Sequence, residues 1–402
     1  MQTRSSAPNL LTYVRLALMV FVHYFIWSCW YNTLSVYLGT LKFSGTQIGL
    51  AYGTTAIGAL VSPFLIGVVA DRFFPAQRIL GALHLIGAGL LWWISQQTEF
   101  GIFYPALIVY TLTYMAGHGL INTITLSHAS NGAFPVIMTA ASAGWIAAGN
   151  LISLTGREDN AGMFTLASMV ALGMGVYSMT LPNTPPKGDQ GPVSAAKILG
   201  LDALRLFKDR SFAVFMVCSF LICIPLSFYF TWTGAFLSEL KVANVGSKMS
   251  LGQVSEMGFL LLLPLLLPRL GVKKILVLGM AAWALRFALF AWFNETPTAL
   301  WALFGGILLH GMCYDFIFVM GRMYVDKFAG EALRASAQGL HAVFTLGAGM
   351  FVGSWLSGAV GQHFTREGGH NWTGVWLVPA AMALVLIPVF LLLFRERSGD
   401  EG

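Results

Sequence analysis

The stretch that decides the fold class is residues 372–394, WTGVWLVPAAMALVLIPVFLLLF, which contains no charged residue. A helix needs about 20 predominantly apolar residues to cross the hydrocarbon core of a bilayer. A surface helix of a soluble protein would instead keep one polar face. These residues therefore predict a transmembrane helix.

The composition extends this prediction to the whole chain. Of 402 residues, 56% are hydrophobic and only 10% are charged, whereas soluble domains carry roughly 25% charged residues. Helices are the open-chain structure that satisfies its own backbone hydrogen bonds inside lipid. We predict an all-α membrane protein with about twelve transmembrane helices, at residues 13–38, 46–70, 79–95, 102–127, 134–154, 163–181, 212–237, 249–267, 275–293, 299–325, 335–360 and 372–394.

The longest polar stretch, residues 182–210, contains four prolines and divides the chain in two. It predicts an N-terminal six-helix bundle at 1–181, a cytoplasmic linker at 182–210 and a C-terminal six-helix bundle at 211–402. Most basic loop residues, such as Arg72, Lys273 and Arg395, fall on one side of the membrane in this arrangement. The positive-inside rule then places both termini in the cytoplasm, and we expect a multi-pass protein of a bacterial inner membrane without a removable signal peptide.

The net charge of +6 is explained by these cytoplasmic loops, so we expect no nucleic-acid partner. The four cysteines all lie in apolar runs, which argues against a disulfide framework. The sequence has no phosphate-binding loop, metal-ligand spacing or nucleophile elbow, so we expect no catalytic residue, metal or cofactor. The expected partners are a small-molecule solute, a proton and the lipid bilayer, and we expect a monomer.

Ionisable residues inside predicted spans indicate function, because each costs about 2.5–3.5 kcal/mol to insert. Glu256 follows Gln253 by three residues, so both lie on one helix face. Together they could bind donors of a polar solute, and Glu256 could also carry a proton. The alternative is a buried Glu that is satisfied by hydrogen bonds to other helices.

The predicted tenth span carries a second polar set. Asp315 and Arg322 are seven residues apart, which suits either a salt bridge or a proton-coupling role for Asp315. His310 and Tyr314 are four apart and share another face, suited to ligand contact or to packing. Arg286, in the ninth span, is expected to anchor its helix to neighbouring helices.

Aromatic residues at helical spacing in the first span, Trp27, Trp30 and Tyr31, could stack on a flat ring such as a sugar or a nucleobase. Ordinary packing is equally compatible with this spacing. After the second predicted span, Gly67, Asp71 and Arg72 resemble the Gly-x-x-x-Asp-Arg gating loop of the major facilitator superfamily. A plain cytoplasmic turn is the alternative for this loop.

Several stretches in order along the chain resemble the nucleoside:proton symporter family of the major facilitator superfamily, namely residues 25–30, 119–124, 200–208, 253–256, 285–291, 314–316 and 333–339. The resemblance implies that Gln253 and Glu256 contact a nucleoside. It also implies that residues at the positions of His310 and Tyr314, which are Tyr and Phe in the enteric permease, line the same pocket.

The chain departs from the family pattern in its fifth and seventh spans. Ser142 and Trp145 fit the family's turn and its aromatic residue, but Met138 stands where the family has Arg. Ser227 and Phe230 stand where the enteric permease has Gln and Asn. Together with the residues above, these are the candidate solute contacts.

The sequence therefore predicts a secondary active transporter that works by alternating access and imports a nucleoside or similar small polar ring solute, coupled to protons through Glu256 and Asp315. The alternatives are a facilitator for another solute such as a sugar, or a non-transporting receptor or scaffold on the same fold. The loss of charge at Met138 favours the last of these.

Overall fold

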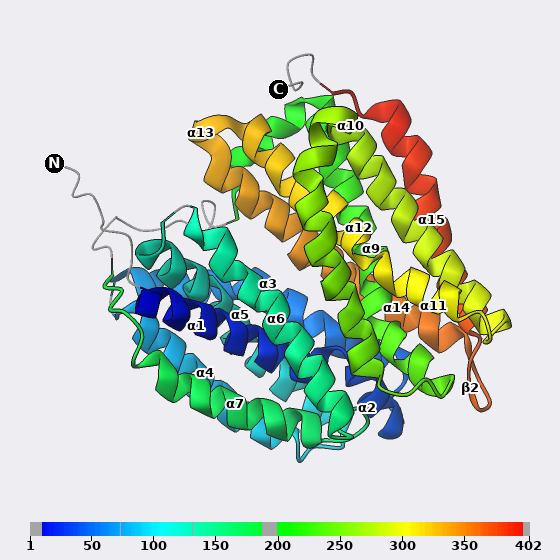
Figure 1. Cartoon of the computed structure of the whole chain (residues 1–402), viewed down its shortest axis with the longest axis horizontal. Coiled ribbons are helices and arrows are strands. Elements are labelled where there is room, and N and C mark those ends of the chain that lie inside the picture. The colour runs from blue at the N-terminus through cyan, green and yellow to red at the C-terminus, as the bar shows by residue number, and fades with distance from the viewer. Residues whose placement is uncertain (1–9, 73, 131, 187–198, 397–402) are drawn as a thin grey trace. The chain divides into compact units, whose positions relative to one another are not determined.

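The computed structural model describes residues 10–72, 74–130, 132–186 and 199–396, apart from the side chains of residues 65–72. The chain forms two compact units (Figure 1). Unit 1 comprises residues 1–41 and 57–193, and unit 2 comprises residues 42–56 and 194–402. The bundle and linker boundaries given above stay a prediction.

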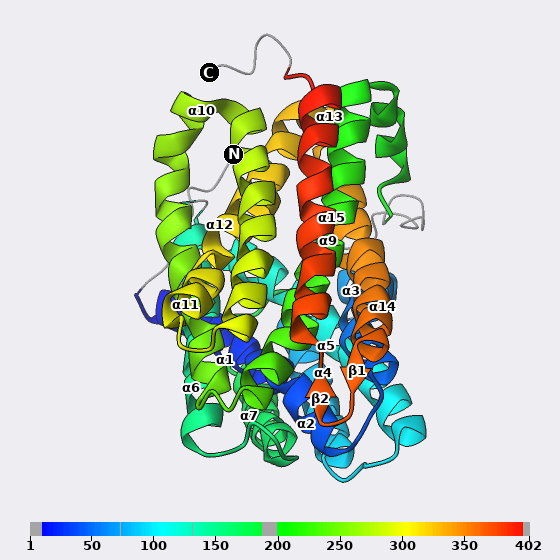
Figure 2. The same ribbon diagram turned by 90° about the vertical axis from the view of Figure 1, so that its right-hand side faces the viewer.

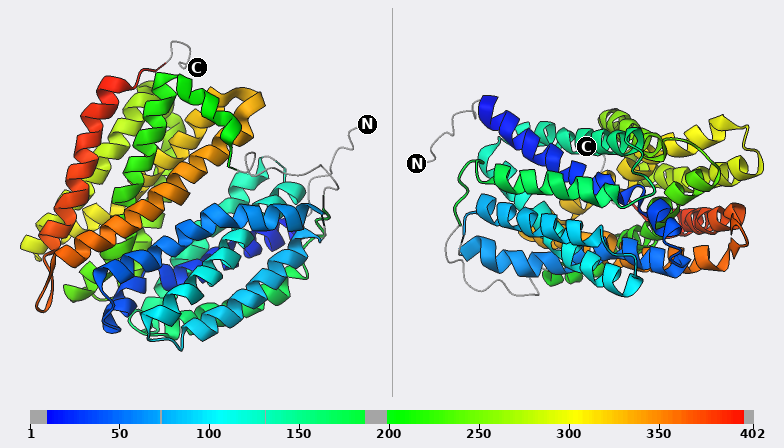
Figure 3. Two further views of the ribbon diagram at one scale, coloured as in Figure 1. Left: turned by 180° about the vertical axis from the view of Figure 1, so that it is seen from behind. Right: turned by 90° about the horizontal axis from the view of Figure 1, so that it is seen from below.

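Unit 1 contains the following helices: α1 (Leu10–Tyr31), α2 (Leu34–Thr40), the later part of α3 (Gly45–Arg72), α4 (Ala76–Ile94), α5 (Phe100–His128), α6 (Ala133–Leu154) and α7 (Gly162–Ser178). Helix α1 packs against α6 and α7, and α4 packs against α5 and α7. The right panel of Figure 3 shows the dark-blue α1 beside the green α7.

The core of unit 1 is aromatic. Trp30 is fully buried, with its ring centroid 6.0 Å from that of Phe164 and 5.9 Å from that of Tyr110. These rings fill the space between α1, α5 and α7. Aromatic pairs at such distances add about 0.5–1.5 kcal/mol beyond the burial of their area. Trp30 therefore packs in this core, and its contact with a solute stays a prediction.

Unit 2 contains the start of α3 and the following elements: η1 (Leu201–Lys208), α9 (Arg210–Glu239), α10 (Val245–Glu295), α11 (Leu300–Leu308), α12 (His310–Tyr314), η2 (Asp315–Val319), α13 (Met320–Ala342), η3 (Val343–Gly349), α14 (Met350–His363), β1 (Thr365–Arg366), β2 (Gly369–His370) and α15 (Trp372–Leu393). The segments η2 and η3 are π-helical, and η1 is a 3₁₀ helix.

Two glycines break the longest helices of unit 2. Gly271 in α10 has φ 71° and Gly330 in α13 has φ 63°, which glycine adopts without the steric penalty of a side chain. Figure 2 shows α10 reversing direction along its length. The break at Gly271 therefore divides α10 into two spans. The break at Gly330 ends one span within α13, and the next span begins after it and continues into α14.

Eight of the described helical stretches are long and apolar enough to cross a membrane. Two of these, of 51 and 64 residues, contain the breaks at Gly271 and Gly330 and so each provide two spans. The shorter helix α7 is also apolar. The predicted all-α membrane architecture is confirmed in the described part of the chain, and the count of twelve spans stays a prediction.

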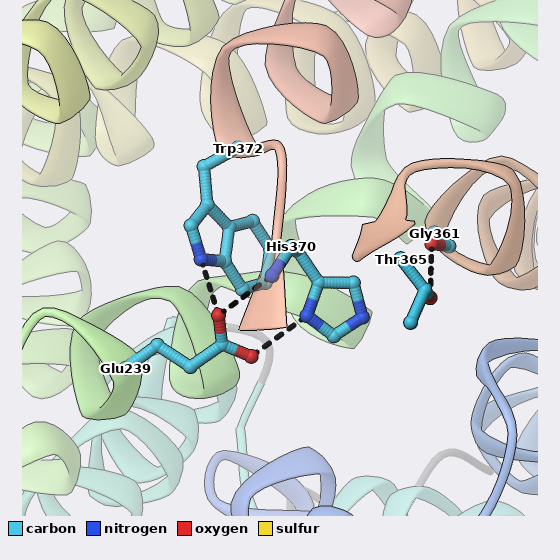
Figure 4. Close-up of polar contacts among 5 residues, drawn as sticks. All are labelled: Glu239, Gly361, Thr365, His370 and Trp372. Carbon is cyan, nitrogen blue, oxygen red and sulfur yellow. Dashed lines mark hydrogen bonds and ion pairs between the residues drawn. The ribbon is translucent and has the colours of Figure 1, made fainter. Parts of the chain in front are cut away.

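A two-stranded hairpin, β1 paired antiparallel with β2, joins α14 to α15 (Figure 2). The Glu239 carboxylate at the end of α9 accepts hydrogen bonds from His370 N at 3.1 Å, His370 Nδ1 at 2.7 Å and Trp372 Nε1 at 2.8 Å. Figure 4 shows this carboxylate facing the hairpin and the start of α15. We call these three residues the hairpin clamp; they fasten the hairpin to α9.

Candidate solute-binding site

The candidate site in unit 2 depends on a close crossing of α10 and α12 at two glycines. A Cβ atom added at Gly311 would lie 2.5 Å from Ser255 O, and one added at Gly252 would lie 3.1 Å from His310 Cβ. The Gly311 N–H also donates to Ser255 Oγ at 3.0 Å. The absence of side chains at both positions lets the two backbones approach, and this approach brings His310 against Gln253.

A buried polar chain follows from this crossing. His310 Nε2 lies 3.4 Å from Gln253 Nε2, and His310 Nδ1 lies 3.1 Å from Arg286 Nη1. The three side chains come from the first half of α10, from α12 and from the second half of α10. Each residue is at most 7% exposed. These polar groups therefore determine one another's orientation.

Arg286 is a fully buried charge that rests on aromatic rings. Its Cζ atom lies 3.4 Å from the centroid of the Tyr229 ring and 5.3 Å from that of the Trp283 ring. A desolvated cation–π contact contributes about 2 kcal/mol or more. Among the described residues, no carboxylate forms an ion pair with Arg286. The expectation that Arg286 ties its helix to its neighbours agrees with these contacts, but its hydrogen bond to His310 was not foreseen.

The predicted face shared by His310 and Tyr314 is confirmed. Their rings stack with centroids 6.0 Å apart, and Phe230 meets the His310 ring edge-on at 6.0 Å. Tyr314, Phe230 and Glu256 are only partly buried, whereas Gln253 is 7% exposed. The site thus combines a carboxylate and an amide one turn apart on α10 with aromatic rings from α9 and α12.

The Ser227 hydroxyl is hydrogen-bonded to backbone carbonyl groups. It is 1% exposed, and its hydroxyl donates to Cys223 O at 2.9 Å and lies 3.3 Å from Met350 O. These bonds link α9 to the start of α14. Its predicted contact with the solute stays a prediction, and its hydroxyl already has backbone acceptors.

Asp315 begins the π-helical segment η2 and is fully buried. Neither of its carboxyl oxygens has a hydrogen-bond partner among the described residues. Arg322 is exposed, and within that part of the chain no ion pair joins it to Asp315. The expected salt bridge between these two residues is therefore wrong for this structure. Proton coupling, the alternative for Asp315, stays a prediction.

In unit 1, Trp27 of α1 and Trp145 of α6 meet edge-on with ring centroids 5.4 Å apart. Ser28 Oγ donates to Trp145 O at 2.8 Å, and a Cβ atom at Gly144 would lie 2.2 Å from Phe21 O. The two helices therefore touch backbone to backbone here. Trp27 and Ser142 remain partly exposed and available for contact, while Trp145 is 7% exposed.

Histidines in unit 1 form a cluster that the sequence did not single out. His23 Nδ1 lies 3.3 Å from His84 Nε2, the Tyr114 ring stacks on His23 at 4.3 Å, and the His118 ring lies 5.6 Å from His23. Because α1, α4 and α5 each contribute one histidine, no local spacing could reveal the cluster. Among the described residues, no group of three or more His, Cys, Asp or Glu side chains is arranged to hold a metal ion.

The predicted gating loop is described only in its backbone. Gly67, Asp71 and Arg72 lie in the last turns of α3. Their side chains lie outside the described residues, so the gating role stays a prediction.

Comparison with known proteins agrees with this arrangement. A family model described as nucleoside H+ symporter matches residues 10–399. The chain belongs to the nucleoside H+ symporter family. It is 38% identical to the putative nucleoside transporter YegT of Escherichia coli (strain K12), over 97% of this chain and 95% of that protein. It is 32% identical to nucleoside permease NupG of the same organism, over 96% of each protein.

The solved structure of nucleoside transporter NupG has the same fold. It superposes with a TM-score of 0.88 at 31% sequence identity, and the match covers 96% of this chain and 100% of that chain. These matches confirm the major facilitator fold and the family. They also confirm that the protein belongs to a class of transporters and not to a class of enzymes. The protein is a multi-pass membrane protein that transports nucleosides together with protons.

Proposed function

We propose that this symporter imports its solute by alternating access and binds it at Gln253 and Glu256, with the rings of His310 and Tyr314 as a wall. The observation that carries this proposal is the meeting of a carboxylate and an amide on α10 with an aromatic stack on α12. A nucleoside offers hydrogen-bonding groups and a flat base, and this site supplies a partner for each.

The names of the relatives support a nucleoside as the solute. YegT is described as a putative nucleoside transporter, and a 31% identical relative is described as xanthosine permease. Partly exposed aromatic side chains in unit 1, such as Trp27, offer a second flat surface. We propose that these rings also contact the solute.

For proton coupling we propose Glu256 and Asp315. Glu256 is partly exposed, whereas Asp315 is buried without a hydrogen-bond partner among the described residues. Moving one proton through 100 mV yields about 2.3 kcal/mol, enough to concentrate a neutral solute roughly fiftyfold.

The membrane orientation is also a proposal. We propose a bacterial inner membrane with both termini in the cytoplasm, because the basic loop residues then lie inside. A reporter enzyme that is active only in the cytoplasm should be active when it is fused after Gly402. Activity of a periplasmic reporter at this position would reverse the topology.

The function is tested with purified protein in liposomes that carry an inward proton gradient. We expect uptake of labelled uridine or inosine that a protonophore abolishes. Glu256→Gln should lower uptake by an order of magnitude or more, because a hydrogen bond to a charged group contributes about 1.5–3 kcal/mol.

The matched control is Glu331→Gln, which makes the same change at an exposed position of α13 and should leave uptake intact. Equal uptake by native protein and Glu256→Gln would remove Glu256 from the mechanism. A native protein that accumulates no nucleoside would contradict the proposed solute.

A further inference from the structure

The imidazole of His310 lies between two groups that carry N–H donors. Arg286 Nη1 lies 3.1 Å from Nδ1, and the Gln253 amide nitrogen lies 3.4 Å from Nε2. A guanidinium has only donors, so Nδ1 must offer its lone pair to Arg286. Protonating both ring nitrogens would place a second positive charge against the buried Arg286, so His310 is neutral.

The neutral ring has one donor and one acceptor nitrogen. Because Nδ1 accepts from Arg286, Nε2 carries the hydrogen and must donate. A donor at Nε2 cannot face the amide nitrogen of Gln253, which is also a donor. The Gln253 oxygen Oε1 is buried and has no hydrogen-bond partner among the described residues.

A half-turn of the Gln253 amide removes the donor–donor contact and gives Oε1 a partner. The nitrogen and oxygen of an amide have nearly the same shape, so exchanging them costs no packing. Oε1 then accepts from His310 Nε2, and the amide NH₂ takes the buried position that Oε1 had, where no described residue pairs with it. The hydrogen bonds therefore run in one direction, from Arg286 through His310 to Gln253.

We propose that Arg286 and His310 are positioning residues that make Gln253 a donor toward the solute, so that Gln253 and Glu256 together select nucleosides whose base has a lactam edge. The proposal rests on the proposed binding site on α10. A lactam edge is a ring N–H beside a carbonyl oxygen. The Gln253 NH₂ donates to the carbonyl, and the Glu256 carboxylate accepts from the ring N–H.

This pairing separates two classes of base. Uridine and inosine present a carbonyl acceptor beside an N–H donor. Cytidine and adenosine present an amino donor beside a bare ring nitrogen, so a donor meets Gln253 and an acceptor meets Glu256. Unpaired polar groups in a desolvated site are strongly penalised, so a site built in this way rejects the wrong partner.

Tyr229 keeps the direction of the chain fixed. Its ring lies 3.4 Å below the Arg286 guanidinium and stacks on His310 at 5.0 Å. Both partners are therefore held on one aromatic surface, and Arg286, which has only donors, keeps the donor role. Arg286 and Tyr229, which are buried, thus influence selectivity without needing to touch the solute.

The test measures how inosine, adenosine, uridine and cytidine raise the thermal unfolding midpoint of the purified protein, which gives apparent dissociation constants by mass action. For the native protein we expect inosine to bind at least about tenfold more tightly than adenosine. We expect the same preference for uridine over cytidine. Binding rather than uptake is the readout, and all four nucleosides are compared at one alkaline pH, because Glu256 must be a carboxylate to accept from the ring N–H.

Three variants address the mechanism. His310→Phe keeps a ring but frees the Gln253 amide to rotate, so adenosine should bind more tightly and the ratio should fall toward one. Arg286→Met should lower the ratio in the same way, whereas Arg286→Lys keeps a donor toward Nδ1 and should retain it. Gln96→Glu, at an exposed position between α4 and α5, is the control that should change nothing.

The outcomes are distinct. If nucleosides bind but the native protein does not prefer the lactam class, this inference is wrong and the nucleoside site stands. If His310→Phe weakens inosine and adenosine equally, His310 has only a structural role and the inference is also wrong. If none of the four nucleosides shifts the midpoint of the native protein, the proposed nucleoside site fails, and this inference fails with it.

Discussion

Replacing Gly311 by Ala should separate the two helices that form the candidate site. The added Cβ atom would lie 2.5 Å from Ser255 O and 2.6 Å from Glu256 N. Both atoms belong to the backbone of α10, so no side-chain rotation can relieve the contact. The helices must move apart at the crossing that holds His310 against Gln253.

The magnitude follows from two opposing terms. Alanine is favoured over glycine in a helix by about 0.8–1.0 kcal/mol. Overpacking that shifts a backbone costs about 1–3 kcal/mol. The net change in the free energy of unfolding at Gly311 should therefore range from near zero to a loss of about 2 kcal/mol.

Gly258→Ala is the matched control, because Gly258 also lies in α10 and a Cβ atom there would meet nothing within 4 Å. It should gain the propensity term without the clash, so the two variants should differ by about 1–3 kcal/mol. The assay is thermal unfolding in detergent, followed by nucleoside binding. Gly311→Ala should lose stability relative to Gly258→Ala and bind inosine more weakly. Equal stability and equal binding of the two variants would show that α10 and α12 do not approach closely at Gly311.

Two further predictions concern other parts of the chain. Glu239→Gln should lower the unfolding midpoint by several degrees relative to Glu331→Gln, because an amide oxygen cannot replace both carboxylate oxygens toward His370 and Trp372; an unchanged midpoint would show that the hairpin clamp does not contribute to stability. Met138→Arg, at a partly buried position of α6, should increase the protonophore-sensitive part of uptake if the family's arginine assists coupling. Strong protonophore-sensitive uptake by the native protein, unchanged in the variant, would refute that role.

Local sequence pattern was sufficient for the spans and for the pairs within one helix. The apolar runs at 249–267 and 275–293 predict separate helices, and Gly271 with its positive φ is the turn between them. The four-residue spacing of His310 and Tyr314 predicts a shared helix face, and in the structure their two rings stack. Such predictions succeed because the geometry of a regular helix fixes which residues share a face.

The salt bridge, one of the two alternatives for Asp315 and Arg322, is not found among the described residues, and helix geometry gives the reason. Seven residues make two turns of a regular α-helix, but Asp315 to Val319 form a π-helical segment. A π turn inserts about one extra residue, and each residue rotates the helix face by about 100°. Arg322 is exposed, and no ion pair among the described residues joins it to Asp315. Nothing in residue spacing alone announces a π segment.

The contacts of His310 show why site chemistry also needs the structure. The resemblance places His310 where the enteric permease has Tyr. A Tyr hydroxyl rotates and can both donate and accept at a single atom, whereas an imidazole holds its donor and acceptor at fixed opposite positions. Because Arg286 meets one ring nitrogen, the other can only donate, and the orientation of Gln253 follows. One substitution on a preserved fold can therefore turn an adaptable hydrogen-bonding position into a directional one, and members of the family that differ at this position should differ in the bases that they accept.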